Sequence, residues 1–513
     1  MLSFLSTLVR STSLYFLSPL QFLWLHIHVP KVFTRITPAS APAHQYHHQS
    51  SEAPSYDKQD VKHANALASI HRATENGPVL QELKHLVQTD GAGNWPPCAT
   101  HGDTWPAALR PYHAIYLEAA PFLATEDVIL DDRVSSQRVD SFRERLRDSL
   151  QSRVDLPSVK DILSAAENEN ATAELSFASY NGFSACMATL RHAFRWGVIP
   201  VVRVAQEQKI ISFPAELDLP WEFICRRYGV TSHGGNVMTN YFSNFDEHDR
   251  IVYQVNGGLS DLIQTAEYNF AHIFVAVERL VYTPTNPPPF KSSKSTRNLT
   301  NSKHALPIYL EMTKAIIHYS RGNRRACLES LRTINSQFSG PPKIFYKTLV
   351  DAHISPEVWM RYVQGFPGWA AGEIIDGEYI EYDGLSGSHS LFFRVADAFL
   401  DIPAYFSEES THRYVPVAQR RLCDAIREHG FRGKARENGD LEIEGEMERM
   451  VQQLRTFRAT HRGRIHKYLS APAPERMIMT AGKSVLESNE IPEIETAIKH
   501  LGGILVNRIK ETR

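Results

Sequence analysis

Hydrophobic residues recur at helical spacing along most of the chain after residue 60. In VLQELKHLVQ (79–88), apolar side chains return every three or four positions, which gathers them on one face of a helix. The same pattern recurs, with Gly, Pro and Asn clusters between segments, at 141–154, 158–169, 219–230, 308–320, 326–338, 347–364 and 389–402. We therefore expect a mainly α fold.

Three segments depart from this amphipathic pattern. WGVIPVVRVAQEQKIISF (196–213) is rich in Val and Ile, which makes it the best candidate for a β-strand. GLSDLIQTAEYNFAHIFVAVERL (258–280) is long and mostly apolar, so we expect it to be buried. The proline, serine and lysine content that follows predicts an exposed loop near 282–305.

The N-terminal residues have a composition of their own. Residues 1–51 contain Arg10, Lys31 and Arg35 but no acidic residue, and the first part is apolar. This composition resembles an organellar transit segment or a short signal or anchor, and a Pro/His-rich linker follows it. We expect an extension over 1–59, either targeting or disordered, with membrane contact of residues 1–30 as one possibility. The expected location is cytoplasmic, with mitochondrial targeting as the alternative.

The remainder divides into a smaller, mostly helical domain at 60–230 and a large α-helical domain at 231–513. The chain has 513 residues, 42% hydrophobic and 22% charged, which is ordinary globular composition. A net charge of -2 argues against nucleic acid as the main partner. Five scattered cysteines without a CxxC pair argue against a disulfide framework and a thiolate zinc site, and fit a reducing compartment. We expect a monomer.

A pair of histidines in FRATHRGRIHKYL (457–469) is the first candidate for chemistry. At 3.6 residues per turn, one stripe of the helix contains Leu454, Phe457, His461, Ile465 and Tyr468. His461 is therefore expected to face the interior and His466 to face water. A lone inward histidine is more often a hydrogen-bonded core residue than a metal ligand, so His461 needs a partner elsewhere in the chain.

Asp397 is the candidate partner. A Gly/Ser turn at 384–390 opens an apolar helix in which Asp397 shares a face with Phe393 and Leu400. An unpaired buried carboxylate is energetically expensive, so a cation or a hydrogen-bond donor should lie near it. On spacing alone, an ion pair with an arginine is the preferred reading.

Taken in order, several segments resemble the indoleamine 2,3-dioxygenase family of haem enzymes. The resemblance runs from about Phe213 to Tyr468 and rests on LPWEFICRRYGV, NVMTNYF, GLSDLIQTAEYNFAHIFVAVE, ISPEVWMRYVQGFPGW, GLSGSHSLFFRVADAFLDI and FRATHRGRIHKYL. The last two segments are the most specific. The resemblance implies an all-α, haem-binding C-terminal domain and haem b as the cofactor.

The resemblance also assigns roles on the proximal side of the haem. His461, seven residues before Tyr468, would be the axial ligand to the iron, and Arg458 would pair with a haem propionate. Asp397 would support the network around the proximal histidine. A neutral imidazole that ligates iron needs an acceptor for its other N–H, and arginine binds a carboxylate in a bidentate manner. Ser386 and Ser388 could hold a propionate or charged groups of a substrate.

The match to the family is weaker on the distal, substrate-binding side. The family positions map onto Trp359, Gln364, Phe270, Phe274, His233 and Asn236. Gln364 stands where the family has an arginine that binds the substrate carboxylate, although Arg361 could take that role from the next turn. Because glutamine carries no charge, we expect a relaxed or different substrate, such as an indole without that carboxylate.

The leading functional hypothesis is a haem-dependent dioxygenase that cleaves the indole C2–C3 bond of L-tryptophan or a related indole. Its partners would be a small-molecule indole and dioxygen, and its product an N-formylkynurenine-type compound. One alternative is a non-catalytic or sensory haem protein that retains the fold. Another is an all-α interaction protein without cofactor, in which His461 and Asp397 form an ordinary buried hydrogen bond.

Overall fold

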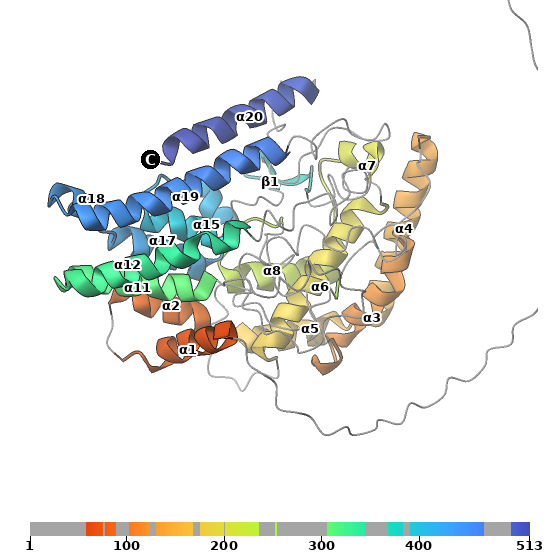
Figure 1. Ribbon diagram of the computed structural model, residues 1–513. Coiled ribbons are helices and arrows are strands. Elements are labelled where there is room, and N and C mark those ends of the chain that lie inside the picture. The colour runs from red at the N-terminus through yellow and green to blue at the C-terminus, as the bar shows by residue number, and fades with distance from the viewer. Residues whose placement is uncertain are drawn as a thin grey trace, which may run out of the picture. The chain divides into compact units, whose positions relative to one another are not determined.

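Helices make up most of the structure, a computed structural model whose elements are drawn in Figure 1. The structure describes residues 58–74, 77–88, 102–123, 130–167, 175–199, 201–234, 252–253, 305–343, 368–382, 390–465 and 494–513. All of these belong to one compact unit, Ser55–Arg513. The predicted mainly α fold is confirmed. The predicted segments 258–280 and 347–364, the loop at 282–304 and the extension up to residue 57 lie outside the described residues.

The first part of the chain forms α1 (Lys58–Arg72), α2 (Pro78–Gln88), η2 (Gly102–Thr104), α3 (Arg110–Ala119), η3 (Ala120–Phe122), α4 (Asp132–Arg153), α5 (Leu156–Glu167), α6 (Phe177–Trp196), α7 (Arg203–Glu207) and α8 (Ala215–Tyr228). The second part forms α11 (Ala305–Ser320), α12 (Arg324–Phe338), β1 (Gly372–Ile375), β2 (Glu378–Glu381), α15 (Leu391–Phe399), α16 (Glu408–Tyr414), α17 (Val417–Glu428), α18 (Arg432–Glu437), α19 (Leu441–Ile465) and α20 (Ile494–Glu511). Within the described ranges, no helix is both long enough and apolar enough to cross a bilayer.

Local sequence signals set the ends of several helices. The Asp131 carboxylate caps α4 by accepting from the backbone N–H groups of Arg133 and Val134, at 2.8 and 3.3 Å. α6 ends at Gly197, whose φ of 68° is left-handed. A Cβ on Gly197 would lie 2.9 Å from the Cα of Val139, so both conformation and close packing require glycine there.

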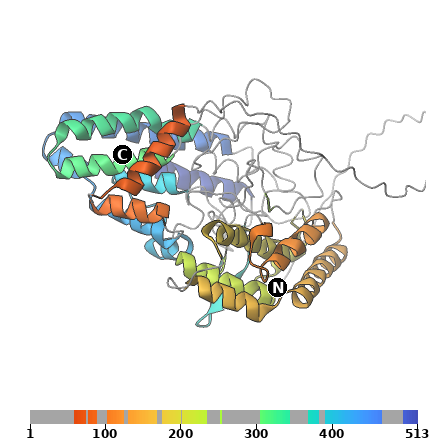
Figure 2. The ribbon, with the colours of Figure 1, turned by 90° about the horizontal axis from the view of Figure 1, so that it is seen from below.

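One hydrophobic core joins α1 and α2 to the C-terminal helices. Leu83 and Leu86 of α2 are fully buried in the same cluster as residues of α11, α12, α15, α17 and α19. Figures 1 and 2 show α1 and α2 beside α11, and α2 also contacts α17. The predicted boundary at 230/231 therefore does not separate the cores, because the apolar faces of α1 and α2 are buried against the C-terminal helices.

A second core lies among α3, α4, α5, α6 and α8 and contains Trp105, Phe183 and Trp221. α8 begins at Ala215, earlier than predicted, so Pro220 lies inside the helix rather than in its first turn. Proline has no backbone N–H to bond the carbonyl four residues earlier, that of Glu216. The Tyr112 hydroxyl donates to this carbonyl at 2.8 Å and compensates for the missing helical bond.

The predicted strand at 196–213 is wrong. The segment contains the end of α6 and the short helix α7, and Ile210 makes an isolated parallel bridge to Gly372. The segment is rich in valine because these side chains are buried in a small cluster with Trp196 and Val139. They do not belong to a sheet. A short apolar run has the same periodicity signal in either setting.

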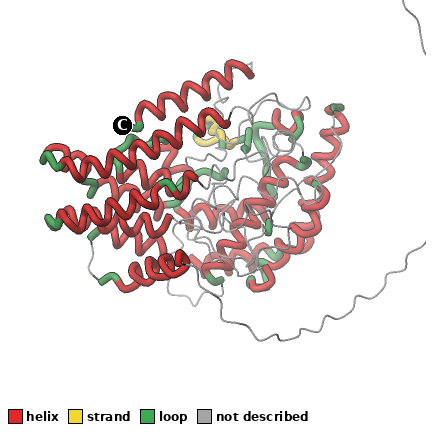
Figure 3. Tube along the Cα trace, viewed as in Figure 1, coloured by secondary structure: helices red, strands yellow, loops and turns green. Residues whose placement is uncertain are grey.

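The regular strands among the described residues are β1 and β2, an antiparallel hairpin shown in yellow in Figure 3. Asp376 and Gly377 connect them with φ of 52° and 87°. Positive φ at both central residues is the geometry that Asp-Gly favours in a two-residue hairpin turn. The preceding residues Trp369 and Ala370 are fixed to α6, because their carbonyls accept hydrogen bonds from the buried Arg195.

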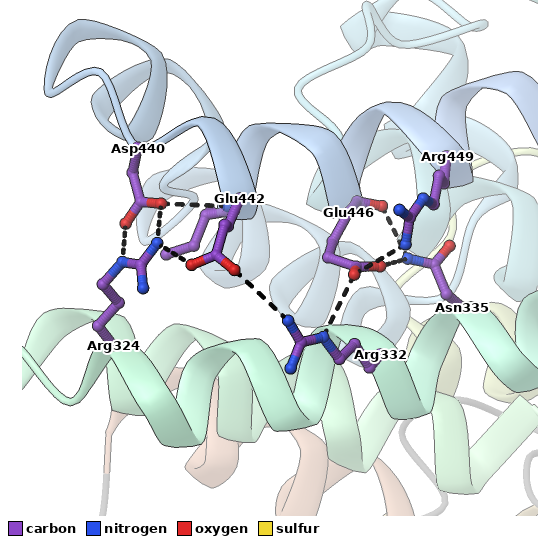
Figure 4. A network of polar contacts seen from close by, with 8 residues as sticks. Arg324, Arg332, Asn335, Asp440, Glu442, Glu446 and Arg449 are labelled. Atoms are coloured by element: carbon purple, nitrogen blue, oxygen red, sulfur yellow. Dashed lines mark hydrogen bonds and ion pairs between the residues drawn. The ribbon is translucent and has the colours of Figure 1, made fainter.

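A network of ion pairs holds α12 against α19 (Figure 4). Arg324 binds both carboxylate oxygens of Asp440, at 2.7 and 2.9 Å. Farther along, the Glu446 carboxylate, whose side chain is only 7% exposed, accepts from Arg332 at 3.4 Å and from Asn335 at 2.8 Å. The network therefore fixes the first half of α19, the helix that carries His461.

Candidate functional site

His461 lies in the last turn of α19, in a column of aromatic rings. Its imidazole is nearly parallel to the Phe457 ring, with centroids 5.9 Å apart and an interplanar angle of 13°. Phe457 in turn stacks on Phe393 of α15, at 4.8 Å and 17°. The predicted stripe is confirmed where it is described, because Leu454 and Phe457 are buried while Arg455 is exposed. Ile465, Tyr468 and His466 fall outside the part of the chain for which side chains are described.

The protein environment keeps the His461 imidazole neutral. Part of the residue reaches solvent, but its Nδ1 atom is buried. Desolvation of the ring lowers the pKa of His461 from 6.5 to about 4. At neutral pH the ring is therefore unprotonated, which is the form that donates a nitrogen lone pair to a metal.

Asp397 is buried on α15, as its position on the apolar face predicts, and it is paired with arginines. Nη2 of Arg458 lies 2.7 and 2.9 Å from the two carboxylate oxygens of Asp397. Arg508 of α20 donates to the same carboxylate. Burial raises the pKa of Asp397 and the arginines oppose that shift. With two guanidinium groups on one carboxylate, we assign Asp397 the ionised form.

Further bonds extend this pair into a cluster that joins α15, α19 and α20. Nη1 of Arg458 donates to the Thr512 hydroxyl at 2.5 Å, and that hydroxyl donates to the carbonyl of Arg508 at 2.7 Å. Nη1 of Arg508 donates to the Pro403 carbonyl at 2.7 Å. We call Asp397, Arg458, Arg508 and Thr512 the C-terminal ion cluster. Its member on α19, Arg458, lies one helical turn before His461.

The C-terminal ion cluster changes the expected contacts of two predicted residues. Arg458 was expected at a haem propionate, and Asp397 in the network of His461. In the structure the two bind one another, which is the arginine ion pair that the spacing around Asp397 favoured. The physical reason is that a fully buried carboxylate is stabilised most by a charged, bidentate donor. Their roles toward a haem stay predictions.

On the distal side, His233 is the one predicted substrate residue within the described ranges. It lies in the loop after α8, where its carbonyl accepts from the buried Arg191 at 3.3 Å. Its Nδ1 lies 3.6 Å from Glu373 of β1. The other residues predicted for substrate or propionate binding lie outside the described residues: Trp359, Gln364, Phe270, Phe274, Asn236, Ser386 and Ser388.

The metal chemistry open to the described residues is limited. Among them, no group of three or more His, Cys, Asp or Glu side chains is placed to hold a metal ion. A metal bound by His461 would therefore need most of its ligands from another source. A surface hollow lined by Phe122, Arg138 and Arg145 beside α4 contains none of the predicted site residues.

The sequence-based interpretation missed α20 and its contribution to this region. Arg508 and Thr512 are buried near the end of α20. A signal for Arg508 was present, because it falls on the same helical face as Leu501 and Ile504, as Asp397 does among apolar residues of its own helix. Pairing these two buried charges across more than a hundred residues required the tertiary structure.

No protein-family model matches the chain, and no curated protein matches its sequence. The family resemblance therefore rests on the quoted segments alone.

Proposed function

We propose that this protein is a haem-dependent dioxygenase that resembles the indoleamine 2,3-dioxygenases, with His461 as the axial ligand of the haem iron. The observation that carries the proposal is the placement of His461, whose ring lies parallel to Phe457 with its Nδ1 atom buried; desolvation lowers the pKa of this ring to about 4. A histidine that stays unprotonated well below neutral pH is available as a ligand at any physiological pH.

The residues present fit haem better than a bare metal ion. Haem would bring its own nitrogen ligands for the iron, so a single protein histidine would be enough to hold it, and His461 would be that residue. The stack of His461, Phe457 and Phe393 restricts the imidazole orientation and provides the apolar surroundings that a macrocycle prefers. Arg458, one turn away, is the residue that we propose to share its guanidinium between Asp397 and a propionate.

In the proposed reaction, bound ferrous haem supplies the activation of dioxygen that leads to cleavage of the indole C2–C3 bond. The chain itself would hold the haem through His461 and orient the indole in an apolar pocket that excludes water. We propose L-tryptophan or a related indole as the substrate. Gln364, in place of the family arginine, favours an indole without the amino-acid carboxylate.

The alternative is a haem protein without turnover or a helical protein without cofactor. The observation that favours this alternative is the pairing of Asp397 with Arg458 and Arg508, because a further ion pair between Arg508 and Glu511 balances the two cations with two anions without a ligand. A fully paired cluster is also what a purely structural role requires.

Absorption spectroscopy of the purified full-length chain, before and after haem reconstitution, tests the proposal. We expect a Soret band that His461→Ala alters or removes, while His466→Ala, the matched control five residues later, leaves it unchanged. Absence of a Soret band in the reconstituted wild-type chain would refute both haem hypotheses. If haem binds, ferrous protein with dioxygen and either L-tryptophan or tryptamine should form an N-formylkynurenine-type product, and a lack of product with both would leave the non-catalytic haem protein.

A further inference from the structure

Arg508 is the second buried arginine that binds the Asp397 carboxylate, after Arg458. Its side chain is 5% exposed, and Arg458 alone contacts both oxygens of Asp397. Burying an additional guanidinium carries a desolvation cost that must be offset by its contacts. Within α20, Arg508 pairs with Glu511 at 3.1 Å. Its contacts outside the helix go to α15 through Asp397 and to the chain after α15 through Pro403, and these attach α20.

We propose that Arg508 is a positioning residue for His461, which holds α20 against α15 and α19 and thereby fixes the helical turn that carries His461. Its importance for a haem ligand rests on the function proposed above. The positional role itself concerns only residues of this chain and can be measured without a cofactor.

The contacts form a closed circuit around the end of α20. Arg508 binds Asp397, Asp397 binds Arg458, Arg458 binds the Thr512 hydroxyl, and that hydroxyl binds the Arg508 carbonyl. Removal of Arg508 opens the circuit and leaves α20 attached by fewer contacts. Arg458 and His461 are three residues apart and therefore occupy neighbouring positions on the surface of α19, so loss of the Arg458 contacts loosens the turn that carries the imidazole.

A second route leads from the same helix to the same ring. α15 carries Asp397 and, one turn earlier, Phe393, which stacks on Phe457 beneath His461. If α20 no longer fixes Asp397, both the ion cluster and the aromatic column lose a constraint. Water then gains access to the imidazole, whose Nδ1 atom is buried in the intact structure.

Hydrogen exchange at the imidazole Cε1–H, followed by mass spectrometry of the full-length protein, tests the proposal without haem. At a fixed neutral pH, the rate of this exchange rises with the access of water to the ring. We expect Arg508→Met to accelerate exchange at His461 roughly tenfold. Arg508→Lys should retain most of the protection, because it preserves the charge. If Arg508→Met does not fold, Thr512→Val takes its place, because it opens the circuit at another bond. We expect Thr512→Val to give a smaller increase in the exchange rate at His461.

Arg324→Met, which removes the ion pair to Asp440 at the other end of α19, is the matched control and should leave exchange at His461 unchanged. The proposal is overturned if folded Arg508→Met, or Thr512→Val in its place, exchanges at the wild-type rate, or if the control accelerates it equally. Haem titration separates this proposal from the function. If Arg508→Met exchanges faster but the protein binds no haem, the positioning role is supported and the haem proposal is refuted. If the protein binds haem but Arg508→Met exchanges at the wild-type rate, the haem proposal is supported and the positioning role is refuted.

Discussion

At the scale of single residues, polar groups meet the buried charges: backbone carbonyls surround Arg195, and opposite charges meet Asp397. Asp397 lies among apolar neighbours on α15 and is matched by arginines from two other helices. His461, by contrast, is kept uncharged by desolvation alone. The two residues that the sequence pointed to are therefore stabilised in opposite ways, one as an ion and the other as a neutral ring.

The neutral state of His461 gives the fold a pH dependence. Its pKa is about 4 in the folded protein and 6.5 when unperturbed, so the unfolded chain binds the proton more readily between these values. The neutral His461 therefore makes its full contribution to the free energy of unfolding above about pH 6.5. This contribution is lost as the pH falls toward 4, by about 2 kcal/mol after allowance for partial exposure. Urea unfolding at several pH values should show this slope, and His461→Gln should flatten it. An unchanged slope in His461→Gln would contradict the assignment.

Asp397→Asn should be strongly destabilising. The amide keeps the shape of the carboxylate but leaves the buried Arg458 without a counter-charge and Arg508 with Glu511 alone, and breaking a buried pair costs about 3–5 kcal/mol in comparable cases. Asp440→Asn, at a pair whose arginine is half-exposed, is the control and should cost about 1 kcal/mol or less. Denaturant unfolding measures both. Equal losses in the two variants would show that the C-terminal ion cluster does not depend on the Asp397 charge.

At the scale of elements, α19 is held at both ends by polar contacts of different kinds. Its first half meets α12 through the ion-pair network of Figure 4, and its last turns meet α15 and α20 through the C-terminal ion cluster. In the network at α12, Arg324, Arg332 and Glu442 are more than half exposed, whereas Asp440 and Glu446 are largely buried. Exposed pairs are weakened by salt, whereas buried ones are screened much less.

This contrast gives a salt-dependent prediction for the contact between α12 and α19. Arg324→Met should lower the free energy of unfolding by about 0.5 kcal/mol at low salt, and the loss should shrink in high salt. Glu446→Ala should cost about 2 kcal/mol at either salt concentration, because it removes the buried carboxylate that accepts from Asn335 and leaves that amide only the carbonyl of residue 446. Thermal unfolding at two salt concentrations distinguishes them. A Glu446 effect that disappears in high salt would argue against its burial.

At the scale of the whole molecule, the compact unit contains hydrophobic cores that do not follow chain order. α1 and α2 complete the core of the C-terminal helices, while α3 to α8 surround another. The first described helices are thus distant in sequence from the helices that bury them. Stability of the region around His461 consequently depends on residues at the start of the unit.

Leu83→Ala and Leu146→Ala form a matched pair that tests this division. Each leucine is buried in a different core, and each substitution should cost about 3 kcal/mol through lost burial and a cavity. We expect Leu83→Ala to increase amide exchange in α11 and α17, and Leu146→Ala to increase it in α3 and α6. Mass spectrometry of exchanged peptides reads out the location. Identical exchange patterns would mean that the cores unfold as one.

The sequence by itself determined the helical segments and the burial of residues on their apolar faces, because periodicity reports which side of a helix avoids water. It correctly placed Asp397, Leu454 and Phe457 inside, and it correctly required a cation near Asp397. Only the tertiary structure decided that this cation comes from Arg458 and Arg508 together, that α1 and α2 belong to the C-terminal core, and that the apolar segment after α6 is not a strand. The physical reason is that the local pattern determines which face of each helix is buried away from water. Which partner covers that face depends on contacts between residues far apart in the chain.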